Sequence, residues 1–219
     1  MYGSSIHAAL QHYFEQLLAS AERPDLDGLL DVFQETWRAC DKPIQYGKRE
    51  DFDFYCRLAD RTLWAFLEGG WAYPEGQIVG VEEELRAPII PGCPDILGRI
   101  DLLVDRGDAL ELRDFKTARS SWNDEHVAEA APQLWLYAEL VRPFAGGRPV
   151  KLAFAVLTKT QSPTFTLHAV ADDARQIART KRIAQRVWRA IEAGHFYPNP
   201  TAANCSTCPY RKPCQAWTG

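Results

Sequence analysis

The stretch Gly98-Arg-Ile-Asp-Leu-Leu-Val104, Asp105-Arg-Gly-Asp108, Ala109-Leu-Glu-Leu-Arg-Asp-Phe-Lys116 decides how this chain is interpreted. Its two apolar runs are typical of short strands, and the polar segment between them is typical of a tight turn. We therefore predict an antiparallel hairpin with a two-residue loop at Arg106-Gly107.

This hairpin brings three charged side chains together. It places Asp101 opposite Leu112, so that Asp114 becomes the diagonal neighbour of Asp101. Lys116 shares the face of Asp114, because side chains alternate along a strand. The rest of that face consists of leucines, and charged groups are costly to bury there unless they are paired or bind a cation. The pattern thus predicts a cation site.

Length and composition indicate one substantial domain with a short C-terminal appendage. The chain has 219 residues, of which 46% are hydrophobic, including seven tryptophans. That is enough for one sizeable core. We expect a cytoplasmic protein with no membrane partner, because the sequence contains no run of about eighteen apolar residues and no secretory signal.

The net charge of −4 argues against a broad electrostatic surface for nucleic acid. A local cluster of basic side chains between residues 175 and 189 leaves room for DNA contacts. The solvated face of a long helix explains that cluster at least as well.

The hydrophobic pattern predicts the order of elements. Residues 1–70 have mostly helical spacing, residues 77–170 contain the strands and one helix at 124–141, and residues 172–194 form a long amphipathic helix. The order helices, three strands, helix, two strands, helix predicts an α/β sandwich with a mixed central sheet and a helical N-terminal part.

The six cysteines fall into two classes. Cys40, Cys56 and Cys93 are scattered and fit small buried apolar positions. A CxxC motif and a third cysteine six positions later lie in a proline-bearing tail, and such a cluster favours metal or iron-sulfur ligands. These are Cys205, Cys208 and Cys214.

Ile100-Asp101 followed by Asp114-Phe-Lys116 resembles the signature of the PD-(D/E)xK nuclease superfamily, and the wider pattern resembles its RecB-like branch. Three further segments match motifs of that branch: Gly3-Ser-Ser-Ile-His7 its histidine helix, Gln133-Leu-Trp-Leu-Tyr137 its QxxxY helix, and Phe196 to Cys214 its iron-sulfur tail. The resemblance implies a restriction-endonuclease-like core in a nuclease domain at 1–200, with a cysteine-rich tail at 201–219.

The resemblance also implies a set of metal ligands. Asp101 and Asp114 would offer the hard oxygen atoms that Mg²⁺ and Mn²⁺ prefer, and the backbone carbonyl of Phe115 would add another. His7 would add a nitrogen, which suits Mn²⁺ better than Mg²⁺. Glu83 is a weaker candidate, chosen because it shares the more apolar face of its strand. A solvated or capping histidine is the alternative for His7.

Lys116 would orient or help deprotonate the attacking water and stabilise the charge that develops on the phosphate. A surface salt bridge between Asp114 and Lys116 is the alternative, but it leaves the other motifs unexplained. Gln133 and Tyr137 lie four residues apart on one helix face. The resemblance places them at the active site and DNA, and a polar pair on a helix surface is the competing interpretation.

The cysteine pattern departs from that branch. A [4Fe-4S] cluster needs four ligands, and this chain has three cysteines in the tail and none before His7. A truncated N-terminus, a degenerate cluster, a substitute among the scattered cysteines, or zinc on the three thiols would each account for the incomplete set.

These observations predict a metal-dependent DNA nuclease, an exonuclease acting in DNA repair, recombination or phage DNA processing. Its substrate would be DNA with a free end or a single strand, with a helicase or recombination protein as partner. The alternative is a catalytically weak DNA-binding or helicase-associated module of the same fold. A metal-dependent hydrolase of another fold would not predict the Gln133 to Tyr137 helix.

Overall fold

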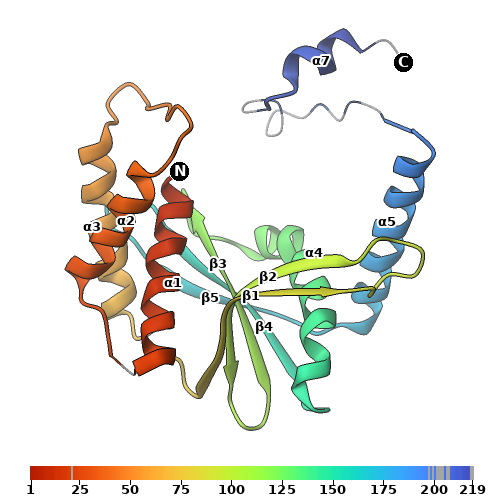
Figure 1. The fold of residues 1–219 in the computed structure, drawn as a ribbon, viewed down its shortest axis with the longest axis horizontal. Coiled ribbons are helices and arrows are strands. Elements are labelled where there is room, and N and C mark those ends of the chain that lie inside the picture. The colour runs from red at the N-terminus through yellow and green to blue at the C-terminus, as the bar shows by residue number, and fades with distance from the viewer. Residues whose placement is uncertain (21, 197, 199, 201–204, 206–207, 218–219) are drawn as a thin grey trace.

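The computed structural model describes residues 1–20, 22–196, 198, 200, 205 and 208–217, and in it five strands form one mixed sheet with helices on both faces (Figure 1). The strands are β1 (Gln77–Ala87), β2 (Ile96–Asp105), β3 (Leu110–Ala118), β4 (Val150–Thr158) and β5 (Phe165–Val170). They follow one another across the sheet in chain order.

Three helices precede the sheet and one helix joins β3 to β4, and α5 and α7 follow β5 in the described part of the chain. They are α1 (Tyr2–Ser20), α2 (Leu26–Arg38), α3 (Phe52–Glu68), α4 (Asp124–Val141), α5 (Ala174–Glu192) and α7 (Arg211–Ala216), with a 3-10 turn η1 (Arg142–Ala145) after α4. Side-chain oxygens cap the first turns of the four helices α2, α3, α4 and α5, which satisfies free backbone N–H groups there. The capping residues are Asp25, Asp51, Asn123 and Asp173.

Neighbouring strands are antiparallel except β3 and β4, which are parallel. A parallel pair needs a crossover connection, and α4 provides it. The predicted α/β architecture with a mixed central sheet is confirmed.

The predicted register of the β2–β3 hairpin was wrong, because the turn lies one residue later in the chain than expected. The loop lies at Gly107-Asp108, since Arg106 N donates to Ala109 O at 3.0 Å. Gly107 has a φ of +81° at the first loop position, which suits a type II′ turn and which glycine adopts without strain. Leu112 therefore pairs with Leu103 rather than with Asp101. The partner of each β3 residue thus lies two residues further along β2 than predicted, and because two is an even number, every side chain stays on the predicted face of the sheet.

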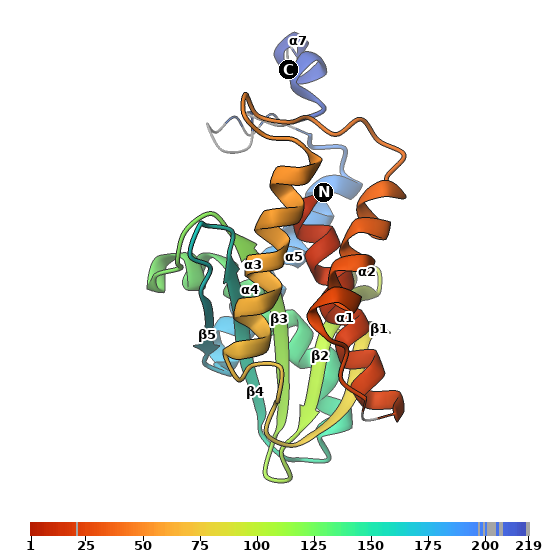
Figure 2. The same cartoon turned by 90° about the vertical axis from the view of Figure 1, so that its left-hand side faces the viewer.

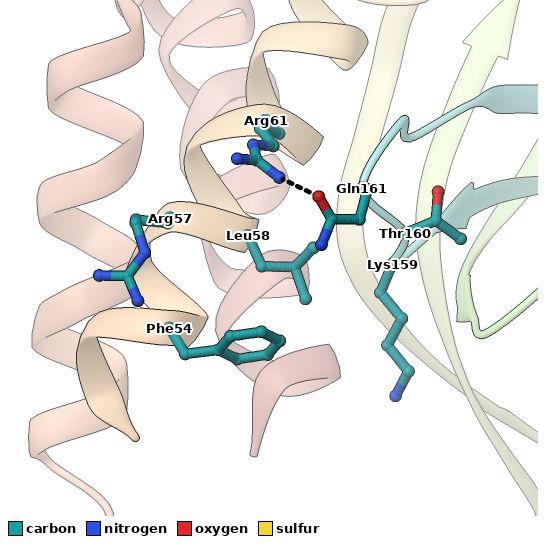
Figure 3. A pocket seen from close by; sticks show the side chains of 7 residues that line it. All are labelled: Phe54, Arg57, Leu58, Arg61, Lys159, Thr160 and Gln161. Carbon is teal, nitrogen blue, oxygen red and sulfur yellow. Dashed lines mark hydrogen bonds between the residues drawn. The ribbon is translucent and has the colours of Figure 1, made fainter. Parts of the chain in front are cut away.

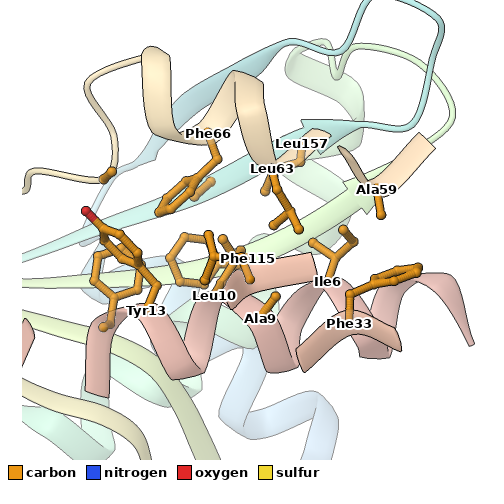
Figure 4. Packing of buried hydrophobic residues seen from close by; sticks show 14 of the residues in the cluster. Ile6, Ala9, Leu10, Tyr13, Phe33, Ala59, Leu63, Phe66, Phe115 and Leu157 are labelled. Carbon is orange, nitrogen blue, oxygen red and sulfur yellow. The ribbon is translucent and has the colours of Figure 1, made fainter. Parts of the chain in front are cut away.

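Two hydrophobic cores lie on opposite faces of the sheet. The larger core joins α1, α2 and α3 to one face of the sheet (Figure 4). In this core Phe115 of β3 stacks on Phe14 of α1, with 5.7 Å between the ring centroids. The second core packs α4 against the other face through residues such as Leu112 and Leu134. Figure 2 shows α1, α2 and α3 in front of the sheet with α4 and α5 behind it. The strand face of leucines predicted from the sequence is the face under α4.

The helix predictions also hold. The span of α4 is as predicted, and the helix continues through Pro132. The long helix at 172–194 begins at Ala174 and ends at Glu192, and Ile177 is its one buried side chain.

No helix in the described ranges has both the length and the apolar composition needed to cross a membrane. The division into a domain at 1–200 and a tail at 201–219 stays a prediction, because much of that tail lies outside the described residues.

Gly98 of β2 allows α4 to approach the sheet closely. A Cβ at this position would lie 2.6 Å from Leu140 Cδ1 and 3.0 Å from Tyr137 Cε1. We expect Gly98→Ala to lower the free energy of unfolding by roughly 1–3 kcal/mol through overpacking. Urea unfolding measures this change. Gly28→Ala in α2 is the matched control, since its new Cβ meets ordinary contacts. Equal stability of both variants would contradict the prediction.

Candidate active site

Asp101 and Asp114 lie where β2 and β3 stop pairing. The ladder between these strands runs from Asp105↔Leu110 to Leu102↔Arg113. The next residues along each strand are the two aspartates. The backbone N–H of Phe115 donates to Asp101 Oδ2 at 2.6 Å, so the carboxylate of β2 occupies a position that a backbone carbonyl would fill in a continued ladder. The end of the hairpin thus brings both carboxylates to one point.

Lys116, Asp114 and two side chains of α4 form a closed polar network. Lys116 Nζ lies 2.6 Å from Asp114 Oδ2 and donates to Gln133 Oε1 at 3.0 Å. The Gln133 amide donates to Asp114 Oδ1 at 2.9 Å and to the Tyr137 hydroxyl at 3.1 Å. Each member of this network fixes the orientation of the next. The prediction that Gln133 and Tyr137 share a helix face is confirmed, and that face points to β3.

His7, Glu82 and Asp101 form a second group beside this network. Their ligand atoms, one from each residue, all lie within 4.8 Å of one another. His7 Nδ1 is 3.9 Å from Asp101 Oδ2. The three residues come from α1, β1 and β2 and line one open pocket. Nitrogen and carboxylate oxygen donors at these separations fit a divalent cation.

The structure places Glu82 in this group, and not Glu83 as expected from alternation. Glu82 has a φ of +52°, a conformation that is uncommon for a residue with a side chain. It interrupts the alternation of β1, and Glu83 lines a separate pocket with Val79 and Leu103. The sequence signal for Glu82 is no stronger than that for its two glutamate neighbours, so the alternation rule could not have found it.

Burial sets the protonation of these groups. Burial, with repulsion from Asp114 as the second cause, raises the pKa of Asp101 to about 7. Burial also raises the pKa of Asp114, although the Lys116 ammonium acts in the opposite direction. The pKa of His7 is lowered by burial and by the charge of Lys116, while hydrogen bonding with the backbone of Phe115 opposes this change. A neutral imidazole is the form that binds metals.

The donor set passes a test of fit for a divalent metal. Asp114 Oδ2 is fully buried, and the Lys116 ammonium at 2.6 Å is its one close partner among the described residues. The carboxylates of Asp101 and Asp114 repel each other, which adds to the cost of ionising Asp101. One ammonium offsets only part of the cost of burying two carboxylates, and a cation would offset more of it. Phe115 contributes its backbone at the same point, between Asp114 and Lys116, while its ring lies in the core.

The structure does not bring the tail cysteines into a site. Cys205, Cys208 and Cys214 are half-buried and form no disulfide with another described residue. Residues 201–204 and 206–207 lie outside the described part of the chain. In the described part, the one group of three or more histidine, cysteine or acidic residues with metal-binding spacing is that of His7. A cluster or zinc on the three thiols therefore stays a prediction.

The family model for the PD-(D/E)XK nuclease superfamily matches residues 1–215. The chain belongs to this superfamily, whose members are nucleases that generally use divalent metals such as Mg²⁺. The resemblance noted from the motifs is thereby confirmed at the level of the superfamily, and the RecB-like branch stays a prediction.

Two solved structures are similar to this chain. A protein from Eubacterium rectale named "putative exonuclease" matches with a TM-score of 0.57 and 15% identity, over 96% of this chain and 74% of that chain. The protein SSO0001 matches with a TM-score of 0.45 and 15% identity, over 94% of this chain and 82% of that chain. The first likeness supports the restriction-endonuclease-like α/β fold. No curated protein matches the sequence.

The raised pKa of Asp101 predicts a pH-dependent cost of folding. An unfolded aspartate has a pKa of about 3.9, so the folded state binds the proton more tightly and this residue removes stability as pH rises from about 4 to about 7. In EDTA, we expect Asp101→Asn to be more stable than the wild type by on the order of 1–3 kcal/mol at pH 8, and by less at pH 5.

Urea unfolding from pH 5 to pH 8 measures this difference. Asp95→Asn, in the exposed β1–β2 loop, is the control and should show little change at any pH. A stability difference for Asp101→Asn that does not grow with pH would contradict the assignment.

Proposed function

We propose that this protein is a metal-dependent nuclease that hydrolyses phosphodiester bonds in DNA and acts from strand ends. The observation that carries this proposal is the contact of Lys116 with Asp114 and Gln133, next to the His7, Glu82 and Asp101 group. An ammonium held between two anchoring groups at the edge of a cation site is suited to orient a water that attacks a phosphodiester and to stabilise the charge that develops. The superfamily supports a nucleic acid substrate.

The metal would be held by side chains from the three strands β1, β2 and β3 and from α1. Asp101, Asp114, His7 and Glu82 would provide the side-chain donors, and the Phe115 carbonyl a backbone donor. When bound, Mg²⁺ or Mn²⁺ would supply positive charge next to the scissile phosphate and lower the pKa of the attacking water. Mg²⁺ usually keeps several waters beside one or two carboxylates, so only part of this donor set would bind it at one time, and the other positions would hold water or substrate oxygens.

Lys116 would orient the attacking water and stabilise the negative charge that develops on the phosphoryl oxygens. Its side chain is held on one side by Asp114 and on the other by Gln133. Such preorganisation means that no side chain has to reorient as charge develops. Gln133 would act as a positioning residue through this contact, and Tyr137 would act through Gln133.

Action from strand ends is the finer part of the proposal. It is supported by the likeness to the E. rectale protein named "putative exonuclease", which shares the fold, and by the open pocket over His7. We therefore expect mononucleotides or short products from a linear strand and no cleavage of a closed circle.

Labelled linear and circular DNA, incubated with Mg²⁺ or Mn²⁺, tests the proposed activity. We expect the wild type to degrade the linear DNA, and Asp114→Asn and Lys116→Met each to lower the rate by roughly 100-fold or more, because each removes charge from the reacting centre. Lys151→Met, at an exposed position at the start of β4, is the matched control and should keep full activity. A wild-type protein that leaves linear DNA intact with both metals would overturn the proposal.

Glu82 and Glu83 provide a neighbouring pair for testing the ligand set. Glu82→Gln removes a carboxylate from the candidate metal group, so we expect the Mn²⁺ concentration for half-maximal cleavage to rise by roughly tenfold. Glu83→Gln, on the opposite side of β1, should leave that concentration unchanged. Titration of cleavage rate against Mn²⁺ gives both values. Equal effects of the two substitutions would exclude Glu82 as a ligand.

A further inference from the structure

A second pocket lies between α3 and the loop that follows β4 (Figure 3). Its volume is about 280 Å³. Arg57, Leu58 and Arg61 of α3 line one side with Phe54, and Lys159 lines the other side with its two neighbours. Arg61 donates to Gln161 Oε1 at 3.4 Å, which joins the two sides. None of these residues belongs to the candidate active site.

The pocket carries positive charge without a matching carboxylate. Among the described residues, Arg57, Arg61 and Lys159 form no ion pair within 4.0 Å. Burial and the nearby Arg119 lower the pKa of Lys159. Arg61 and Lys159 line the pocket from opposite sides, and neither forms an ion pair with a described carboxylate, so an anion that binds between the two sides would gain from both charges. This concentration of charge is notable in a chain with a net charge of −4.

The acid that acts on Lys159 already makes other hydrogen bonds. Glu50 is the carboxylate that acts on Lys159, but its Oε2 accepts hydrogen bonds from the Tyr55 hydroxyl at 2.7 Å and from Gly47 N at 2.9 Å. These bonds hold Glu50 to its own loop. The cations of the pocket are therefore available to an anion from outside the chain.

The other wall of the pocket is apolar. In Figure 3 the ring of Phe54 and the side chain of Leu58 point toward the Lys159 side of the pocket. A free inorganic anion would gain nothing from these groups. A nucleotide would, because it combines a phosphate with a sugar and a base that pack on apolar or aromatic side chains.

The pocket lies beyond the same ends of β3 and β4 as the candidate active site. Lys116 pairs with Val156, and Lys159 follows three residues later, with its backbone N–H bonded to Ala118 O at 2.8 Å. Three residues of strand span roughly 10 Å. The Lys159 ammonium also lies 5.9 Å from the ring centroid of Tyr2, the first residue of the helix that carries His7.

A nucleic acid strand can bridge this separation. At a rise of about 3.4 Å per nucleotide in a duplex, roughly 10 Å corresponds to about three nucleotides. We propose that the pocket of Arg57, Arg61 and Lys159 binds a phosphate group of the nucleic acid substrate, a few nucleotides from the bond that is cleaved. The choice of substrate rests on the proposed nuclease function, whereas the pocket itself rests on its own charges and lining.

Binding of single-stranded DNA in EDTA tests this proposal without requiring cleavage. Fluorescence anisotropy would be measured with labelled 12-mers that carry a 5′-phosphate, a 3′-phosphate or hydroxyl groups at both ends. We expect Arg61→Ala/Lys159→Ala to weaken binding roughly tenfold, and the slope of log affinity against log salt to become shallower by about 0.7, the value for one phosphate on a single strand. Arg61→Lys/Lys159→Arg should bind within about threefold of the wild type, because it keeps both charges.

Arg23→Ala/Lys151→Ala is the matched control. It removes the same charge from exposed positions after the end of α1 and at the start of β4, and should leave affinity unchanged. Circular dichroism and thermal unfolding would confirm that all variants fold.

The three 12-mers separate the two sources of the phosphate. A loss confined to one end-phosphorylated 12-mer assigns the pocket to a strand end, and an equal loss on all three assigns it to an internal phosphate. Unchanged affinity of Arg61→Ala/Lys159→Ala for all three, or no binding by the wild type, overturns the proposal. A wild type that binds DNA in EDTA but cleaves none with metal refutes the nuclease activity alone.

Discussion

The burial of Asp101 and Asp114 at the end of one hairpin is the constraint on which the rest of the site depends. Both carboxylates have raised pKa values, because burial opposes their ionised forms. Lys116 offsets part of that cost from one side, and a backbone N–H of β3 offsets another part. The remaining cost is what makes the position favourable for a cation. The helices on each face are arranged around this point: α1 brings a neutral imidazole to it, and α4 brings an amide that holds the lysine.

The two faces of the sheet contribute differently to the candidate site. On the face under α4, Gln133 and Tyr137 fix the position of the ammonium, and their contacts are short and closed among themselves. On the face under α1, His7 and Glu82 line an open pocket with Asp101. One face therefore fixes the candidate catalytic groups in place, whereas the other is open to solvent. Phe115 belongs to both faces, because its backbone lies between Asp114 and Lys116 and its ring packs on Phe14.

Local pattern was sufficient to predict the elements, their order and most of the site. Alternation places Asp114 and Lys116 on one face whatever the turn, so the hairpin error at Gly107 left the site intact. Helical spacing likewise paired Gln133 with Tyr137. Two features depended on information that periodicity does not carry. The position of the turn depends on Gly107, which adopts a positive φ without strain. The choice of Glu82 over Glu83 in the candidate metal group depends on the positive φ of Glu82, which is uncommon for a residue with a side chain. Packing between distant segments sets how deeply Asp101 and Asp114 are buried and which charges lie near Lys159, and the residue pattern does not encode this packing directly.

The residues of the candidate site are far apart in the sequence, which has a consequence for when the site forms during folding. His7 and Lys116 are separated by 109 residues, about half of the chain, and the connection from β3 to its parallel neighbour β4 runs through α4. Neither the hairpin alone nor the first helix alone contains a full set of donors. Because contacts between distant segments require loop closure, the complete set exists only in a chain whose first helix has docked on the sheet. A partly synthesised or partly unfolded copy therefore lacks the complete set of candidate donors, and hydrolysis that needs the whole set would begin only after α1 has docked on the sheet.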